Sequence, residues 1–167
     1  MRNLILGLFI LASINLNAQS EAAKLVEDGL QKSQMGNYEE ALALYTKAIT
    51  TDAAHLDAYV KRAYVNSILK NYKATIEDYT KILTERPKMG MVFVSRGSAY
   101  NKLKEYEKAI SDFNSAIALN EKNSEAYNNR GWAKKALGDP DGACQDWKTS
   151  KKLGNEEAKI ILKNNKC

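Results

Sequence analysis

A repeat with a constant period runs through most of this chain. Four segments of ten letters resemble one another and follow at equal intervals of thirty-four positions: GNYEEALALY at 36, KNYKATIEDY at 70, KEYEKAISDF at 104 and GDPDGACQDW at 138. In proteins with such a period, each repeat is a small structural unit that buries its apolar face against its neighbours. The period divides the chain into four units, at residues 22–55, 56–89, 90–123 and 124–157.

Residues at equivalent positions of the four units are similar in size. Mostly small residues occupy three of these positions, which are Gly29, Ala63, Gly97 and Gly131; Ala41, Thr75, Ala109 and Ala143; and Ala48, Ile82, Ala116 and Ser150. Bulky residues occupy two others, which are Leu25, Tyr59, Phe93 and Tyr127; and Tyr45, Tyr79, Phe113 and Trp147. Small residues let two helices approach closely, and large side chains can fill the space beside them.

Apolar residues within each unit recur with the period of an α-helix. We therefore predict two helices of about 14 residues in every unit, joined by a short turn. Asn and Asp are favoured where a helix begins, so we expect the turn residues to cap the second helices. These turn residues are Asn37, Asn71, Asp139 and, as a weaker cap, Glu105. Pro87 lies at the end of the second unit, where a helix must stop.

The repeat length, the small and aromatic positions and the place of the turn resemble the tetratricopeptide repeat (TPR) over residues 22–157. The resemblance implies an all-α fold, a TPR solenoid in which antiparallel helix pairs form a right-handed superhelix. It also implies that the first helix of each pair lines a concave groove, which binds a peptide or a helix of a partner protein. The fourth unit departs from the pattern, because Pro140 stands where the earlier units have tyrosine.

In the groove that this resemblance implies, side chains of the first helices would contact the partner. The predicted contact residues are Val26, Leu30, Val60, Lys61, Tyr64, Ile68, Val94, Ser98, Lys102, Asn128, Asn129, Trp132 and Lys135. This surface mixes apolar and aromatic groups with a few cations, which suits an extended or helical segment with apolar anchors. Trp132 and Tyr64 are expected to contribute most to binding, because large amphipathic rings often dominate interfaces. The alternative is that either ring packs against a neighbouring helix.

Some members of the family hold a C-terminal carboxylate in a clamp of Lys, Asn and Arg side chains. Val26 and Leu30 stand where such a clamp would need Lys and Asn. Of the clamp residues, only one has a counterpart in this chain, at Asn129. We therefore do not expect the chain to bind partners through a carboxylate clamp.

Opposite charges recur at two further equivalent positions. These residues are Arg62, Arg96 and Arg130 in the first helices, and Asp78, Asp112 and Asp146 in the second helices. The first unit has Asp28 and Leu44 at these places, so both partners are missing together. We expect one salt bridge in each of units two to four, with independent solvated charges as the alternative. An exposed pair would add only about 0–1 kcal/mol, so its expected role is to set geometry.

Residues 1–18 have the pattern of a secretory signal peptide. Arg2 is followed by an apolar run from Leu4 to Leu16, which is too short to span a bilayer comfortably. We expect cleavage after Ala18, with residues 19–21 as a short tail before the first repeat, and an exported protein, periplasmic or secreted. The alternative is an N-terminal anchor that is not cleaved.

A capping helix is expected at the C-terminal end, over residues 158–167, because a stacked array must cover its last apolar face. Cys144 and Cys167 would lie at similar heights on neighbouring helices. An oxidising location favours a disulfide between them, which would add about 3 kcal/mol in the chain-entropy model. The alternative is a buried Cys144 and a free Cys167.

The remaining features argue against catalysis. The one histidine, His55, lies at a unit boundary and is expected to be a surface turn residue, so we predict no metal and no cofactor. The net charge of +5 falls to +4 without Arg2, and we expect this charge to be spread along the chain. A charge this small is not typical of a nucleic-acid-binding protein, so we predict no nucleic acid as a partner. The predicted function is therefore an exported, non-enzymatic adaptor for a protein or peptide partner. The alternative is a structural subunit of a larger cell-envelope assembly.

Overall fold

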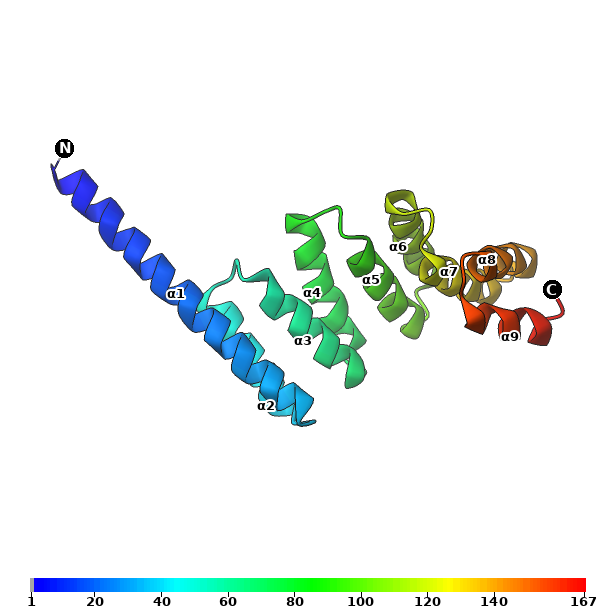
Figure 1. Cartoon of the computed structure of the whole chain (residues 1–167), viewed down its shortest axis with the longest axis horizontal. Coiled ribbons are helices and arrows are strands. Elements are labelled where there is room, and N and C mark those ends of the chain that lie inside the picture. The colour runs from blue at the N-terminus through cyan, green and yellow to red at the C-terminus, as the bar shows by residue number, and fades with distance from the viewer. Residues whose placement is uncertain (1) are drawn as a thin grey trace. The chain divides into compact units, whose positions relative to one another are not determined.

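The computed structural model describes residues 2–167 of the chain, with side chains from Asn17 onward. Within these residues it contains nine helices and no strand (Figure 1), so the predicted all-α fold class is confirmed. The helices are α1 (Arg2–Gln34), α2 (Tyr38–Thr51), α3 (Leu56–Ile68), α4 (Tyr72–Glu85), α5 (Gly90–Lys102), α6 (Tyr106–Leu119), α7 (Ser124–Ala136), α8 (Pro140–Lys152) and α9 (Glu156–Asn164). Helices α2 to α8 have 13 or 14 residues each, close to the length predicted from the repeat.

The helices form two compact units, the first of which extends to Asn71 and contains α1, α2 and α3. Helix α2 packs against both α1 and α3. Side chains from all three helices share one apolar cluster, to which α1 contributes Leu25 and Val26, α2 contributes Tyr45, and α3 contributes Val65.

Helix α1 continues through Ala18 without a break, so residues 19–21, expected as a short tail before the first repeat, are helical. The segment that follows Ala18 contains no Gly or Pro before Gly29, and Ala22 is fully buried in the first unit. Good helix-forming residues and a buried face therefore favour a continuous helix.

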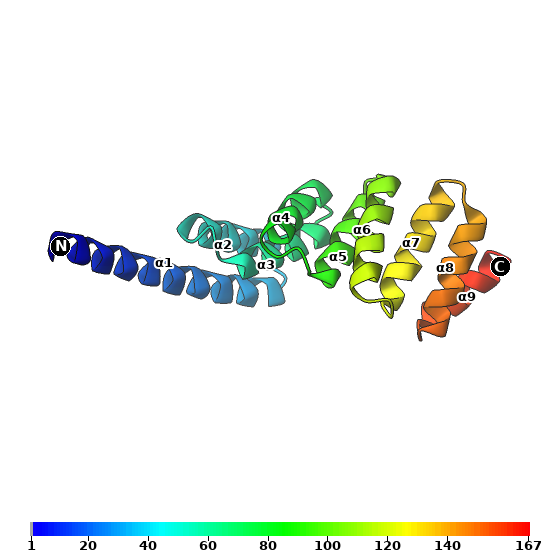
Figure 2. The ribbon, with the colours of Figure 1, turned by 90° about the horizontal axis from the view of Figure 1, so that it is seen from above.

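The second unit runs from Tyr72 to Cys167 and contains α4 to α9. Each of these helices packs against the next one along the chain, and α5 also contacts α7. Figure 2 shows α5, α6, α7 and α8 side by side, with α9 against α8. Phe113 of α6 and Trp147 of α8 are buried at the centres of two apolar clusters.

Only some of the predicted N-cap residues cap their helix with a side-chain hydrogen bond. Asp139 accepts a hydrogen bond from the backbone N–H of Gly142 at 2.9 Å, as expected of an N-cap. Asn37 and Glu105 occupy N-cap positions but make no such bond. The Glu105 carboxylate is instead held 2.5 Å from the Lys108 ammonium group. The capping helix α9 begins at Glu156 rather than 158, because Asn155 caps it through the N–H of Ala158.

The small and aromatic positions of the repeat meet in both units. A Cβ added at Gly29 would lie 2.6 Å from a ring atom of Tyr45, and one added at Gly97 would lie 2.8 Å from a ring atom of Phe113. At Gly131 the distance to Nε1 of Trp147 would be 2.5 Å. Glycine therefore provides the space into which the aromatic ring of the second helix fits.

Gly131→Ala is expected to destabilise the protein by about 2 kcal/mol, because the added methyl group overlaps a buried, inflexible indole ring. The gain in helix propensity, about 1 kcal/mol, offsets only part of that strain. Gly90→Ala is the matched control, since its Cβ would have no neighbour closer than 3.9 Å. Urea unfolding followed by circular dichroism measures both variants. Equal stability of the two variants would show that the ring can move aside at no cost.

Candidate partner-binding surface

A hollow of about 460 Å³ opens on the second unit, where α5 and α7 lie beside each other. Its lining residues are Ser98, Asn101, Lys102, Tyr106, Asn129, Trp132 and Ala136. Ser98, Lys102, Asn129 and Trp132 are among the contact residues predicted from the sequence, and the structure brings these four together. The prediction missed Asn101, Tyr106 and Ala136. Asn101 and Ala136 lie one helical turn beyond predicted residues, so the helical period could have indicated them.

One wall of the hollow is a hydrogen-bonded polar network. The Asn129 side chain donates to the Ser98 hydroxyl at 3.3 Å, and the Asn101 side chain donates to the backbone carbonyl of Asn129 at 3.2 Å. The Asn101 carbonyl oxygen Oδ1 is buried and has no hydrogen-bond donor among the described residues. A buried acceptor without a donor is costly, because its hydrogen bond to water is lost on folding.

Trp132 is fixed in place yet remains accessible. Its ring meets the ring of Trp147 edge-on, with centroids 5.1 Å apart and an interplanar angle of 63°. The Lys135 ammonium group lies 5.5 Å from its centroid. Nevertheless 41% of Trp132 is exposed to solvent. From the sequence, packing against a neighbouring helix and exposure to a partner were alternatives for this ring. In the structure the ring is both packed and exposed.

One set of the predicted contact residues faces the interior of the helix stack and not the solvent. Val26 and Val94 are buried in apolar clusters, and Asn128 is only 4% exposed. The Asn128 side chain donates to the Glu157 carboxylate of α9 at 3.2 Å. Val60, at the equivalent position of α3, is half-buried. We therefore correct the prediction for Val26, Val94 and Asn128, because this side of the first helices packs inside the stack and cannot reach a partner.

The next set, one helical turn further along, is the accessible one. In the first unit, Leu30 of α1 and Tyr64 and Ile68 of α3 are exposed, and Tyr64 has 58% of its surface open to solvent. In the second unit, Trp132 occupies the position equivalent to Leu30 and Tyr64. Lys61 is half-buried. Three of the four equivalent positions on this side of the first helices therefore have an exposed apolar side chain.

Two of the predicted salt bridges are present within the second unit. Arg96 pairs with Asp112 through two bonds of 2.8 Å, and Arg130 pairs with Asp146 through bonds of 2.6 and 2.8 Å. Hydrogen bonding to the carboxylate raises the pKa of each arginine from its ordinary value, and burial opposes this effect. Arg62 and Asp78 belong to different units, so their pairing stays a prediction.

Each arginine also makes a contact that the sequence analysis missed. One of its terminal nitrogens donates to a polar side chain on the second helix of the preceding repeat. These contacts are Arg62 to Thr46 at 3.2 Å, Arg96 to Thr80 at 3.0 Å and Arg130 to Asn114 at 2.6 Å. In the second unit the guanidinium group thus joins a neighbouring repeat to the carboxylate of its own repeat. The constant spacing of these pairs was visible in the sequence, but polar residues on a helix surface carry no sign of their partner.

Comparison with known proteins identifies the repeat. A family model described as TPR repeat matches residues 97–138, and one described as tetratricopeptide repeat matches residues 32–55. The structure of MamA from Desulfovibrio magneticus RS-1 superposes with a TM-score of 0.76 and 19% identity, covering 80% of this chain and 75% of that one. A thermophilic TPR protein in Thermus thermophilus gives a TM-score of 0.64 and 20% identity, with 80% and 74% covered. The chain is a tetratricopeptide repeat protein.

No curated protein matches the chain in sequence. Because they are less than 25% identical to it, the two structural neighbours establish the fold of this TPR protein and nothing about its partner. TPR proteins generally bind other proteins, and their stacked repeats create extended concave surfaces for this purpose.

The last helix of this TPR protein stands where the first helix of a fifth repeat would begin. Cys144 and Cys167 form a disulfide, with Cα atoms 5.5 Å apart. Cys144 occupies the repeat position that Ile110 has in the preceding unit, and Cys167 occupies the position that Ala133 has. Ile110 and Ala133 belong to one apolar cluster. The disulfide thus lies where the preceding repeats contribute apolar side chains to a shared cluster.

The described part of this TPR protein has neither a cluster of metal-ligating side chains nor a candidate membrane span. No group of three or more His, Cys, Asp or Glu side chains within it is arranged to hold a metal ion. His55 is the N-cap residue of α3, and its side chain makes no capping hydrogen bond. Among the helices described, none has both the length and the apolar character needed to cross a membrane.

Proposed function

We propose that this TPR protein is a non-catalytic adaptor that binds a peptide or a helix of a partner protein at the hollow between α5 and α7. The observation that carries the proposal is Trp132, a large ring held by Trp147 and still 41% exposed beside a polar wall. Large amphipathic rings in this setting commonly dominate binding energy.

The lining of the hollow suggests what kind of segment binds there. Trp132 provides an apolar surface for an aliphatic or aromatic side chain of the bound segment. Lys102 adds a positive charge at the same place. This combination favours a segment with an apolar anchor and a nearby carboxylate. In the first unit, Leu30, Tyr64 and Ile68 offer further exposed apolar contacts for a partner.

The proposed function can be tested by exchanging the central ring. The partner captured by wild-type protein from an envelope extract is expected to bind Trp132→Ala about 30-fold more weakly, since hot-spot residues contribute about 2 kcal/mol or more. Trp132→Phe is expected to retain most of the affinity because it keeps an apolar ring. Leu119→Ala is the matched control, since Leu119 is equally exposed at 43% but does not line the hollow.

Surface plasmon resonance with the identified partner measures all three variants. Wild-type affinity in Trp132→Ala, or an equal loss in Leu119→Ala, would show that the partner binds elsewhere. Circular dichroism of each variant checks that the fold is retained.

We also propose that the protein is exported, with residues 1–18 removed as a signal peptide. The charged start and apolar run of this segment support the proposal, and so does the disulfide, since disulfides persist in oxidising compartments. Cleavage would leave α1 to begin at Gln19. The intact mass of protein recovered from producing cells tests this proposal, and a mass that includes residues 1–18 would contradict it.

A further inference from the structure

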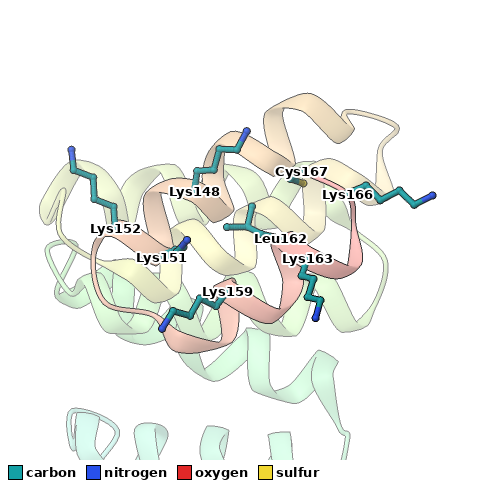
Figure 3. A pocket seen from close by; sticks show the side chains of 8 residues that line it. All are labelled: Lys148, Lys151, Lys152, Lys159, Leu162, Lys163, Lys166 and Cys167. Carbon is teal, nitrogen blue, oxygen red and sulfur yellow. The ribbon is translucent and has the colours of Figure 1, made fainter.

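A second hollow, of about 690 Å³, lies at the C-terminal end of the second unit, between α8 and α9 (Figure 3). Three of its lining lysines come from α8, namely Lys148, Lys151 and Lys152. Three others come from α9 and the residues after it, namely Lys159, Lys163 and Lys166. Leu162 and the disulfide-bonded Cys167 complete the lining. We call this site the lysine hollow, and it shares no residue with the hollow around Trp132.

The lysine hollow contains most of the net charge of the protein. Residues 148–167 include six Lys and two Glu, a net charge of +4, whereas the whole chain has a net charge of +5. The expectation that the charge is spread along the chain is therefore wrong. Packing α9 against α8 brings the six lysines around one depression, where they repel one another and attract anions.

Few of these lysines are neutralised within the protein. Lys159 lies 2.8 Å from the Glu156 carboxylate, and the two side chains are both exposed. The hydrogen bond from Lys159 lowers the pKa of Glu156, and the charge of Lys151 contributes to the same shift. Among the described side chains, no carboxylate lies within 4.0 Å of the ammonium groups of the other five lysines.

The centre of the lysine hollow is apolar and rigid. Figure 3 shows Leu162 in the middle, with the lysine side chains around it pointing outward in different directions. Leu162 and Cys167 pack against the buried cluster of Ala143, Trp147 and Ile161. The disulfide from Cys167 to Cys144 joins this floor to α8. An occupant would therefore meet an apolar surface in the centre and cations on all sides.

The separated lysines and the apolar centre of the lysine hollow favour one class of anionic partner over the others. The six ammonium groups point in different directions rather than toward one phosphate group (Figure 3), and the hollow contains no arginine to grip one in a bidentate manner. A polypeptide with several carboxylates can spread them over the rim and place an apolar side chain on Leu162.

We propose that the lysine hollow binds an acidic segment of a partner protein, in which carboxylates on both sides of one apolar residue pair with the lysines. The site lies outside the proposed adaptor hollow and gives the protein a second, charge-selective binding surface. Its recognition depends on the fold, because three of the lysines come from each side of the turn between α8 and α9.

A synthetic peptide with three acidic residues on each side of a central leucine is the probe, and fluorescence anisotropy measures its binding to the full chain. We expect binding that weakens as salt is raised, since exposed charges are screened. The analogue with Gln and Asn in place of the acids should not bind. The analogue with serine at the centre should bind several-fold more weakly, and equal binding would overturn the role of Leu162.

Two double variants with the same change in net charge provide the matched comparison. Lys151→Gln with Lys163→Gln should weaken peptide binding about tenfold, because both charges are lost at the site. Lys88→Gln with Lys122→Gln removes two exposed lysines outside the hollow and should change affinity less than twofold. Equal losses in both pairs would show that only net charge matters and would overturn the proposal. Binding to phosphatidylglycerol vesicles with loss in the first pair, and none to the peptide, would assign the site to membranes instead and overturn it too.

Discussion

Asp146→Ala should destabilise the second unit by about 3 kcal/mol, because removal of the buried carboxylate leaves two half-buried cations without their counter-ion. Asp146 is only 4% exposed at its carboxylate and binds Arg130 through two hydrogen bonds. It also lies 2.9 Å from the Lys134 ammonium group. Urea unfolding followed by circular dichroism measures the loss.

Two comparisons separate the causes of this effect. Glu85→Gln breaks an exposed pair with Lys81 and should leave stability unchanged, because exposed ion pairs contribute little. The double variant Arg130→Met with Asp146→Leu should recover part of the loss, since apolar substitution of both partners leaves no orphan charge on the arginine side. If Asp146→Ala were as stable as Glu85→Gln, the pair would behave as two solvated charges, the alternative that the sequence left open.

Cys144→Ser with Cys167→Ser should cost about 3 kcal/mol in the chain-entropy model for a separation of this length. The effect should be concentrated in α9, because this helix has only nine residues and so short a helix is unstable on its own. Hydrogen exchange measured by mass spectrometry should show loss of protection over residues 156–167, while α5 and α6 stay protected.

Reduction of the wild-type protein is the matched experiment, and it should reproduce the change in α9 without any substitution. The double variant should then be insensitive to reductant. Unchanged protection of α9 after reduction would show that Leu162 and Ile161 hold this helix without the disulfide. Because Cys167 and Leu162 form the floor of the lysine hollow, loss of α9 should also weaken binding of the acidic peptide.

Most of the fold could be predicted because the same pattern of residues occurs in all four repeats. Each occurrence indicates the same arrangement of two helices. The spacing of Gly131 and Trp147, repeated at Gly29 and Tyr45, indicated that a small residue on one helix faces an aromatic ring on the next. The charges that recur at one constant spacing predicted the pair of Arg130 and Asp146 in the same way. Equivalent positions must satisfy the same packing, so their chemistry shows which contacts lie within a repeat.

The rotation of each helix about its own axis could not be read from the repeat. Val94 and Ser98 both have an equivalent in every repeat, yet Val94 is buried between helices and Ser98 lines a hollow. Both positions recur with the same period, so the period does not distinguish a buried position from an exposed one. Only the contact with the neighbouring helix decides which of the two side chains remains open to a partner.

The sequence by itself determined the number of repeats, their helix pairs, the glycine and aromatic positions and the positions of the paired charges, because each of these depends on spacing along one chain. The tertiary structure decided which side of the first helices is accessible and how the end of the array is closed. It also brought Lys151 and Lys163 to one depression. These features depend on how one helix packs against the next, since side chains distant in sequence become neighbours only when their helices are in contact.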